Sequence, residues 1–289
     1  MPEVAPIATI PGVDADRVAC GPDGAWAAAA RRVLTLGDGR RLEAPRPLTG
    51  ALRFSADGSA VLAGTERLEL ATGAWADLAD PLPAVAEGLG PLELTGAAWD
   101  AAGSRLVVAA ERRPSHSPRA GPAPPEAWLA LIDGRTRAAL RELWTGGGLP
   151  PRWIAFEGGV VAADPDRGAR LWTGEDEWAP DPGPVDGLAL GDGGRLLALS
   201  HPDGRVALRR GTGFDEPSEA GTGATGPVAA AAGAPVIAWA TGAGVTVLAR
   251  GAESHIPADE PRALALADDG RRLALLDRER TLHLFGIRG

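Results

Sequence analysis

Leu-Arg-Phe-Ser-Ala-Asp-Gly-Ser-Ala-Val-Leu-Ala-Gly, at residues 52–64, is the stretch whose pattern the rest of the chain repeats. Leu52 and Phe54 alternate with polar residues, as in a β-strand that has one buried face. Asp57-Gly58 is a turn dipeptide that tolerates positive φ, and an apolar run follows it. The stretch therefore predicts a β-hairpin.

Further copies of this strand, turn and strand pattern follow one another along the chain. Each copy has a glycine in its turn, and each continues into a second hairpin. The turn glycines are Gly24, Gly58, Gly103, Gly159, Gly193, Gly233 and Gly270. They lie about 41 residues apart on average, which matches the period of roughly 40 to 45 residues that is typical of four-stranded propeller blades.

The repeats predict an all-β fold in which one domain, residues 1–289, forms a seven-bladed β-propeller with four antiparallel strands in each blade. The seventh copy has three strands of its own. An orphan strand at residues 4–10 is expected to complete it, which would join the two ends of the chain and remove an exposed sheet edge. The expected blades span residues 17–45, 47–79, 94–143, 151–181, 184–218, 226–258 and 261–289.

The composition opposes several classes of partner. Glycine (40 residues) and proline (26 residues) are abundant, which is typical of many short elements joined by tight turns. The net charge of −9 opposes binding to a nucleic-acid backbone, because such binding needs a surplus of cationic side chains. We find neither a signal-peptide pattern nor an apolar run long enough to span a membrane, so we expect a cytoplasmic protein with no membrane partner.

Few side chains are available for catalysis or metal binding. Cys20 is the only cysteine and lies in an apolar strand, which predicts a buried hydrophobic residue. The four histidines are His116, His201, His255 and His283. They form no metal-ligand or acid–base motif, and a type I turn explains why Asp203 lies beside His201. We also find neither a nucleophile elbow nor a phosphate-binding loop, so we predict no catalytic, cofactor-binding or metal-binding residue.

One face of the expected ring carries most of the charged loops. In a propeller, the loops between the second and third strands of each blade share a face with the connections between blades. Here those loops are rich in arginine, and insertions at residues 80–93 and 112–126 lie on the same side. Arginine is favoured where carboxylates are bound bidentately, so this face is predicted to bind another protein. The candidate residues are Arg112, Arg113, His116, Arg119, Asp166, Arg167, His201, Asp203, Arg205, Arg278 and Arg280.

Two segments resemble a known family. Residues 54–63, Phe-Ser-Ala-Asp-Gly-Ser-Ala-Val-Leu-Ala, and residues 131–140, Leu-Ile-Asp-Gly-Arg-Thr-Arg-Ala-Ala-Leu, resemble the two hairpins of a blade in bacterial WD40-type β-propellers. The resemblance spans nearly the whole chain and implies a rigid platform on which other proteins assemble. No third strand ends in Trp-Asp and no Gly-His precedes a first strand, so the Asp–His hydrogen-bond network of regular WD40 repeats is not expected.

These patterns leave several functions to be distinguished. The leading prediction is a non-enzymatic scaffold or adaptor, monomeric or one subunit of a hetero-complex, that binds a partner protein through the charged face. The alternative is an enzyme or small-molecule binder that uses the central channel, as lactonase-like and lyase-like propellers do. Nucleic-acid binding by the arginine-bearing loops is opposed by the acids among them. Mixed charges that only keep the loops solvated would also explain this face.

Overall fold

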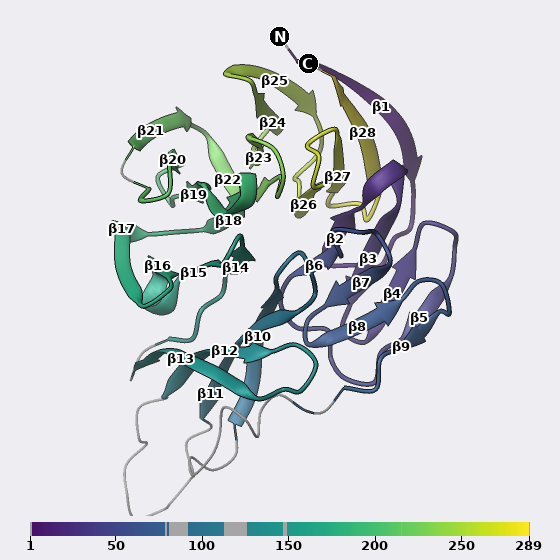
Figure 1. Ribbon diagram of the computed structural model, residues 1–289. Helices are drawn as coiled ribbons and strands as arrows, with labels where there is room; N and C mark the ends of the chain where they lie inside the picture. The colour runs from purple at the N-terminus through teal and green to yellow at the C-terminus, as the bar shows by residue number, and fades with distance from the viewer. Residues whose placement is uncertain are drawn as a thin grey trace, which may run out of the picture.

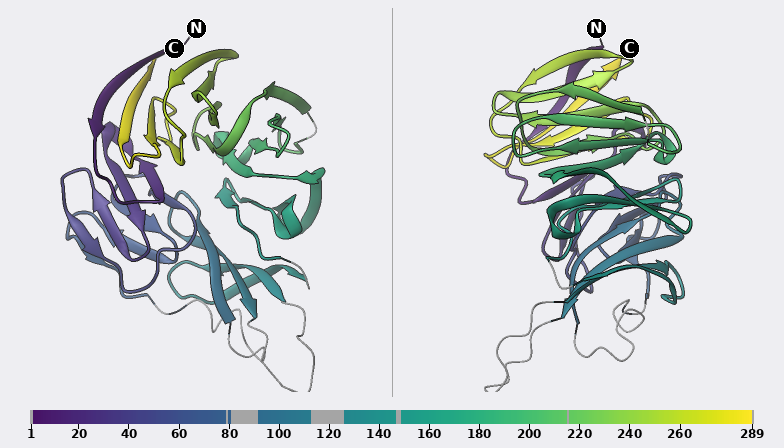
Figure 2. Two further views of the ribbon diagram at one scale, coloured as in Figure 1. Left: turned by 180° about the vertical axis from the view of Figure 1, so that it is seen from behind. Right: turned by 90° about the vertical axis from the view of Figure 1, so that its left-hand side faces the viewer.

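The computed structural model describes residues 2–78, 80, 92–112, 126–146, 149–214 and 216–288. These residues form seven four-stranded antiparallel sheets, which stand as blades around a ring (Figures 1 and 2). The predicted all-β propeller is therefore confirmed. We call the strands of each blade a to d, from the axis outward.

Blades 1 to 4 follow one another along the chain. Blade 1 comprises β2 (Arg17–Cys20), β3 (Trp26–Ala30), β4 (Val33–Leu36) and β5 (Arg41–Glu43). Blade 2 comprises β6 (Leu52–Phe54), β7 (Ala60–Ala63), β8 (Glu66–Glu69) and β9 (Ala74–Trp75). Blade 3 comprises β10 (Leu92–Trp99), β11 (Arg105–Arg112), β12 (Ala127–Asp133) and β13 (Ala139–Gly146). Blade 4 comprises β14 (Ile154–Glu157), β15 (Val160–Ala163), β16 (Gly168–Thr173) and β17 (Asp176–Pro184).

Blades 5 to 7 complete the ring. Blade 5 comprises β18 (Gly187–Gly191), β19 (Leu196–Ser200), β20 (Val206–Arg210) and β21 (Glu216–Gly221). Blade 6 comprises β22 (Ala224–Ala230), β23 (Val236–Thr241), β24 (Gly244–Ala249) and β25 (Ala252–Pro257). Blade 7 comprises β26 (Ala263–Leu266), β27 (Arg272–Leu276), β28 (Leu282–Arg288) and β1 (Glu3–Ile10). Short 3-10 turns are η1 (Pro22–Gly24), η2 (Pro165–Arg167) and η3 (Asp192–Gly194). Within the described ranges, no helix is long and apolar enough to cross a membrane.

The hairpin of β6 and β7 shows how local contacts set a turn. Asp57 Oδ1 accepts hydrogen bonds from Ser55 Oγ at 2.6 Å, from Ser59 N at 3.0 Å and from Ser59 Oγ at 2.8 Å. The Ser55 hydroxyl and then the Ser59 donors lower the pKa of Asp57 to about 2. Gly58 has a φ of 68°, in the left-handed region that favours glycine. The Asp-Gly pair therefore fixes the turn, as the sequence predicts.

The two ends of the chain close the ring. β1 pairs antiparallel with β28, from Glu3 opposite Arg288 to Ile10 opposite Leu282. The N- and C-termini lie side by side as a result (Figure 1). This confirms that the N-terminal strand completes blade 7. A register shift at Ile7 interrupts the pairing and leaves that side chain 53% exposed.

The core lies between the blades. The described residues form seven apolar clusters, and each cluster joins the facing sheets of two neighbouring blades. The largest buried side chains include Trp99, Trp172 and Trp239, which pack at the seams between blades 2 and 3, 3 and 4, and 5 and 6. These indoles fill the wedge that opens between twisted sheets, so they stabilise the ring and are not available as a stacking platform.

Candidate functional site

The strand pairings place the predicted partner-binding residues on one side of the ring, which we call the loop face. It is formed by the b–c loops and by the connections from strand d of one blade to strand a of the next. Arg112 ends strand b of blade 3, and the b–c loops of blades 4, 5 and 7 hold the others: Asp166, Arg167, His201, Asp203, Arg205, Arg278 and Arg280. Arg113, His116 and Arg119 lie outside the described residues, as do residues 81–91 of the other insertion.

Most of the candidate arginines on the loop face already have acidic partners. The pairs are Arg112 with Glu126 at 3.1 Å, Arg205 with Asp181 at 3.4 Å, Arg278 with Glu260 at 3.0 Å and Arg280 with Asp14 at 3.0 Å. Asp181 is buried, but the other three pairs are exposed, and exposed pairs contribute at most about 1 kcal/mol each to stability. These four arginines are therefore each paired with an acid and do not form a patch of unpaired positive charge.

Asp166 and Arg167 fasten the connections that flank blade 4. Asp166 Oδ1 accepts a hydrogen bond from Leu149 N at 2.8 Å, and Asp166 N donates to Leu149 O at 3.2 Å. Arg167 O accepts from Val185 N at 2.9 Å. Both loop residues have positive φ values, 53° and 71°. Their backbone conformation is thus held by neighbouring segments, and the two residues position the loop.

His201 is buried at the seam between blades 4 and 5. Its Nδ1 lies 3.0 Å from Pro184 O, and its Nε2 lies 3.5 Å from Asp181 Oδ2, which also receives Arg205 at 3.4 Å. Asp203, the nearest acid in sequence, instead accepts the backbone N–H of Arg205 at 3.0 Å. The sequence patterns did not identify Asp181 as the partner of His201, because the two residues belong to different blades.

A second His–Asp contact lies within blade 7. His283 Nε2 is 2.9 Å from Asp277 Oδ2, and Asp277 Oδ1 accepts the backbone N–H of Thr281 at 2.8 Å. Across the described part of the chain, no three His, Cys, Asp or Glu side chains come together as a metal site would require. Both contacts link neighbouring segments, and Asp181 also receives Arg205.

Blade 3 extends farther toward the loop face than its neighbours. Its strand b, β11, has eight residues, whereas strand b of the other blades has four to six. Ala51 N donates to Ala97 O at 2.8 Å, so Ala97 lies level with the start of blade 2. Residues 92–96 continue beyond that level, and Leu92 still pairs with Arg112. The extension is a regular sheet that the neighbouring blades do not match.

The outer edge of blade 3 is the most open of the described outer strands. β5 and β9 have only three and two residues, and β1, β17, β21 and β25 contain proline, which cannot donate a backbone hydrogen bond. β13 has eight residues and no proline. Leu140 near its start is 52% exposed, and Leu149 beyond its end is 47% exposed. Register shifts in the pairing with β12 leave Leu140 and Leu143 without a residue opposite.

The innermost strands line the central channel, and one position in them differs between blades. Arg53 of blade 2 occupies the place that alanine fills in every other blade. The equivalent residues, matched by their register with strand b, are Ala19, Ala98, Ala155, Ala189, Ala229 and Ala265. The small alanine side chains leave a cavity of ≈ 210 Å³ on the axis, which a longer side chain can enter.

Arg53 crosses this channel and connects three blades. Its Nη1 donates to Glu157 Oε2 of blade 4 at 2.9 Å, and its Nη2 lies 3.5 Å from Asp268 Oδ1 of blade 7. The side chains of Arg53 and Glu157 are 19% and 11% exposed. The contacts lie at the a–b turns, so they close the channel at the end opposite the loop face. The charged groups of the channel thus bind one another, and the volume is below the roughly 300–1,000 Å³ of most ligand pockets.

Replacement of Arg53 by alanine is expected to destabilise the fold by about 1–3 kcal/mol, because Glu157 is left mostly buried without its cation. Urea unfolding followed by circular dichroism measures the loss. Arg195→Ala is the matched control: Arg195 is 61% exposed and pairs with Asp192 at 3.3 Å on the same side of the ring. The control should cost less than about 0.5 kcal/mol. Equal effects of the two substitutions would contradict the cross-channel role of Arg53.

The blades and these contacts define the class of protein: a closed seven-bladed β-propeller with a braced channel. The chain matches no family model and no curated protein sequence. The chain is therefore assigned to this class from its fold alone. Its function is inferred from the surfaces on which one blade differs from the rest.

Proposed function

We propose that this protein is a non-enzymatic adaptor that binds a partner protein at blade 3. The observation that carries the proposal is the sheet of blade 3, which extends beyond its neighbours and ends in the long, proline-free strand β13. An exposed strand edge presents unpaired N–H and C=O groups, to which an extended peptide segment can add as a further strand. Leu140 and Leu149 add exposed apolar anchors near the two ends of this strand.

The loop face contributes specificity in this proposal. Its arginines, such as Arg112 and Arg278, are held in exposed pairs that a partner's carboxylates can exchange at little cost. The resemblance of the hairpins to bacterial WD40-type propellers agrees with a platform role. A ring that closes within one chain supports a monomer that joins other proteins as a rigid subunit, and the proposed location is the cytoplasm.

We favour an adaptor over an enzyme or a small-molecule binder that uses the central channel. The walls of the channel are mostly alanine and other aliphatic side chains. The charged groups Arg53, Glu157 and Asp268 are engaged with one another, so none is poised to act on a substrate. General acid–base or metal chemistry needs groups that converge on a reacting atom, and no such group projects into the free part of the channel among the described residues.

Affinity co-purification with the full chain tests the proposal. The tagged protein is expected to retain a stoichiometric partner from its native host, and the double variant Leu140→Lys/Leu149→Lys is expected to retain at least tenfold less of it. Ile7→Lys is the matched control, because Ile7 is equally exposed but lies on β1. Circular dichroism verifies that all three proteins are folded. Equal recovery with all three proteins, or no stoichiometric partner with the native chain, would overturn the proposal.

A further inference from the structure

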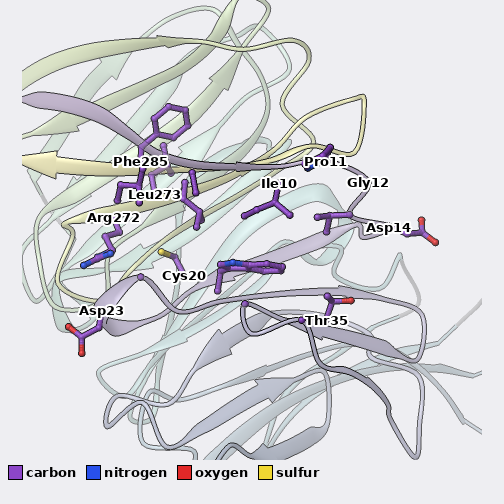
Figure 3. A pocket seen from close by; sticks show the side chains of 18 of the residues that line it. Ile10, Pro11, Gly12, Asp14, Cys20, Asp23, Thr35, Arg272, Leu273 and Phe285 are labelled. Atoms are coloured by element: carbon purple, nitrogen blue, oxygen red, sulfur yellow. The ribbon is translucent and has the colours of Figure 1, made fainter.

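A groove of ≈ 660 Å³ lies at the seam where the ring closes. One wall is formed by β1, β27 and β28 of blade 7, and the other by blade 1 (Figure 3). The groove runs from Pro11 and Gly12 beside the loop face to Asp23 and Arg272 at the opposite end (Figure 3). Its volume lies within the range of roughly 300–1,000 Å³ that is typical of small-molecule pockets.

The groove forms because the outer half of blade 1 is small. Its strand d, β5, has only three residues, and Gly37 and Gly39 in the adjoining c–d turn have no side chains to cover blade 7. On the other wall, the register shift at Ile7 turns that side chain outward at the rim. The apolar face of blade 7 therefore stays partly uncovered at this seam.

The walls and floor of the groove are mostly apolar between its two charged ends. Ile10 and Leu284 of blade 7 pack in one cluster with Trp26 and Cys20 of blade 1. Cys20 lies at the floor (Figure 3). Burial raises the pKa of the Cys20 thiol to about 12, although the nearby Arg272 opposes this shift. The thiol therefore stays protonated at neutral pH and acts as one more apolar surface.

One end of the groove holds Arg272, whose side chain has no ion-pair or hydrogen-bond partner among the described residues. The guanidinium of Arg272 is half-buried and lies directly against Gly24, where any Cβ would collide with it. Its side chain forms neither an ion pair nor a hydrogen bond with any residue in the described ranges. Asp14, at the other end, is already bound by Arg280 at 3.0 Å. The hydrogen-bonding capacity of Arg272 is therefore directed at the groove and its solvent.

Nearby acids do not cancel this charge. Asp23 and Asp269 stand close to the same end, but both are exposed and neither is within ion-pair distance of Arg272. Solvent and salt screen exposed charges far more than half-buried ones. Arg41 lines the outer part of the groove and likewise forms no ion pair with a described residue. The groove thus favours an anionic group at the Arg272 end.

We infer that this seam groove binds a small amphipathic carboxylate. The apolar part of the ligand packs against Ile10, Trp26 and Leu284, and the carboxylate accepts paired hydrogen bonds from the guanidinium of Arg272. Such a ligand contacts both blade 7 and blade 1. Because it binds only the closed ring, its occupancy stabilises the closure. The inference is independent of the adaptor proposal, since Arg272 and blade 3 lie on different parts of the ring.

Calorimetric titration of the full chain with decanoate and with decanol tests the inference, because the two probes share an alkyl chain and differ in charge. Decanoate is expected to bind at least tenfold more tightly than decanol and to raise the midpoint of thermal unfolding. Arg272→Met is expected to remove this preference. The matched control is Arg271→Met, which changes the exposed neighbouring arginine and should leave the preference intact.

A second variant locates the bound probe. Thr35 lines the groove from β4, so Thr35→Trp should fill the space and weaken binding of both probes at least tenfold (Figure 3). If Thr35→Trp does not fold, the Arg272→Met result decides alone. The inference is overturned if decanoate does not bind, if the two probes bind the native chain equally, or if Arg272→Met leaves the preference for decanoate unchanged.

Discussion

A chain that lacks residues 2–10 is expected to unfold about 10 °C below the full chain. The deletion removes β1, and with it the ladder to β28 and the contacts of Val4 and Ile10 with the clusters on either side of blade 7. These losses amount to about 5 kcal/mol. In a chain of this size, 1 kcal/mol shifts the unfolding midpoint by roughly 2 °C.

The deletion also breaks a link to the preceding blade and exposes a new edge. Ser254 Oγ of β25 donates to Pro2 O at 2.5 Å, which ties the start of the chain to blade 6. Without β1, strand β28 becomes the outer strand of blade 7, and its unpaired backbone groups can pair with another chain. Thermal melts by circular dichroism measure the stability, and size-exclusion chromatography measures the expected association.

A peptide of residues 2–12 provides the control for this prediction. When added in excess, it should restore the unfolding midpoint of the shortened chain, since it can occupy the vacant place beside β28. A scrambled peptide of the same composition should not. If the shortened chain melts within about 2 °C of the full chain, then β1 does not contribute the closure energy assigned to it.

The fold could be predicted because turn chemistry repeats at a fixed period. Glycines such as Gly24 and Gly103 have φ values of 83° and 66°, which few other residues adopt at low cost. Gly233 is the exception among the predicted turn glycines, since its φ is not positive. Neighbouring blades hold its turn instead: Gly233 N donates to Asp268 O at 2.8 Å, and Ala231 O accepts from Asp192 N at 2.9 Å. The turn at Gly233 was predicted at the correct place, but contacts with neighbouring blades hold it, and not a positive φ of the glycine.

Arg53, which crosses the channel, could have been identified from the sequence, although the search for hairpins did not consider it. Arg53 stands where alanine stands in the other copies, so an alignment of the copies singles it out. The partners of Arg53 could not be predicted from the sequence, because Glu157 is 104 residues away and Asp268 is 215 residues away. Only the closure of the ring brings strands of such separation to one axis.

The loop face illustrates the same limit. The sequence identifies the charged loops and their common side, since strand order alone determines both. It does not show that Arg278 would be held by Glu260, 18 residues earlier, or Arg280 by Asp14 near the other end of the chain. Pairing of this kind depends on distances between loops of neighbouring blades, which no local pattern encodes. By contrast, the sequence itself shows that residues 139–146, which form β13, contain no proline that would block pairing at this edge.

Replacement of Trp99 by alanine is expected to destabilise the fold by about 3–5 kcal/mol, the usual cost of truncating a fully buried Trp. Trp99 is 2% exposed, packs with Leu62 and Ile132 at the seam between blades 2 and 3, and donates its Nε1–H to Gly64 O at 2.9 Å. Urea unfolding measures the effect. Trp178→Ala is the matched control, because Trp178 is only half-buried and its Nε1 bonds no acceptor among the described residues; it should cost roughly half as much.

A double-mutant cycle separates the packing of Trp99 from its effect on Arg137. The Arg137 guanidinium lies 5.1 Å from the centroid of the indole ring and donates to Thr65 O at 2.6 Å. Burial lowers the pKa of Arg137 to about 10, an effect that the carboxylate of Glu66 opposes. Two of its nitrogens lack a partner in the described ranges, so the ring face compensates part of the cost of burying this cation.

Arg137→Met is therefore expected to cost little in the native chain, because it removes unsatisfied donors together with the contact to the indole. In a Trp99→Phe background, the two substitutions should deviate from additivity by about 0.5–2 kcal/mol. Strictly additive effects would mean that the indole does not stabilise the buried guanidinium, and that the seam between blades 2 and 3 depends on apolar packing alone.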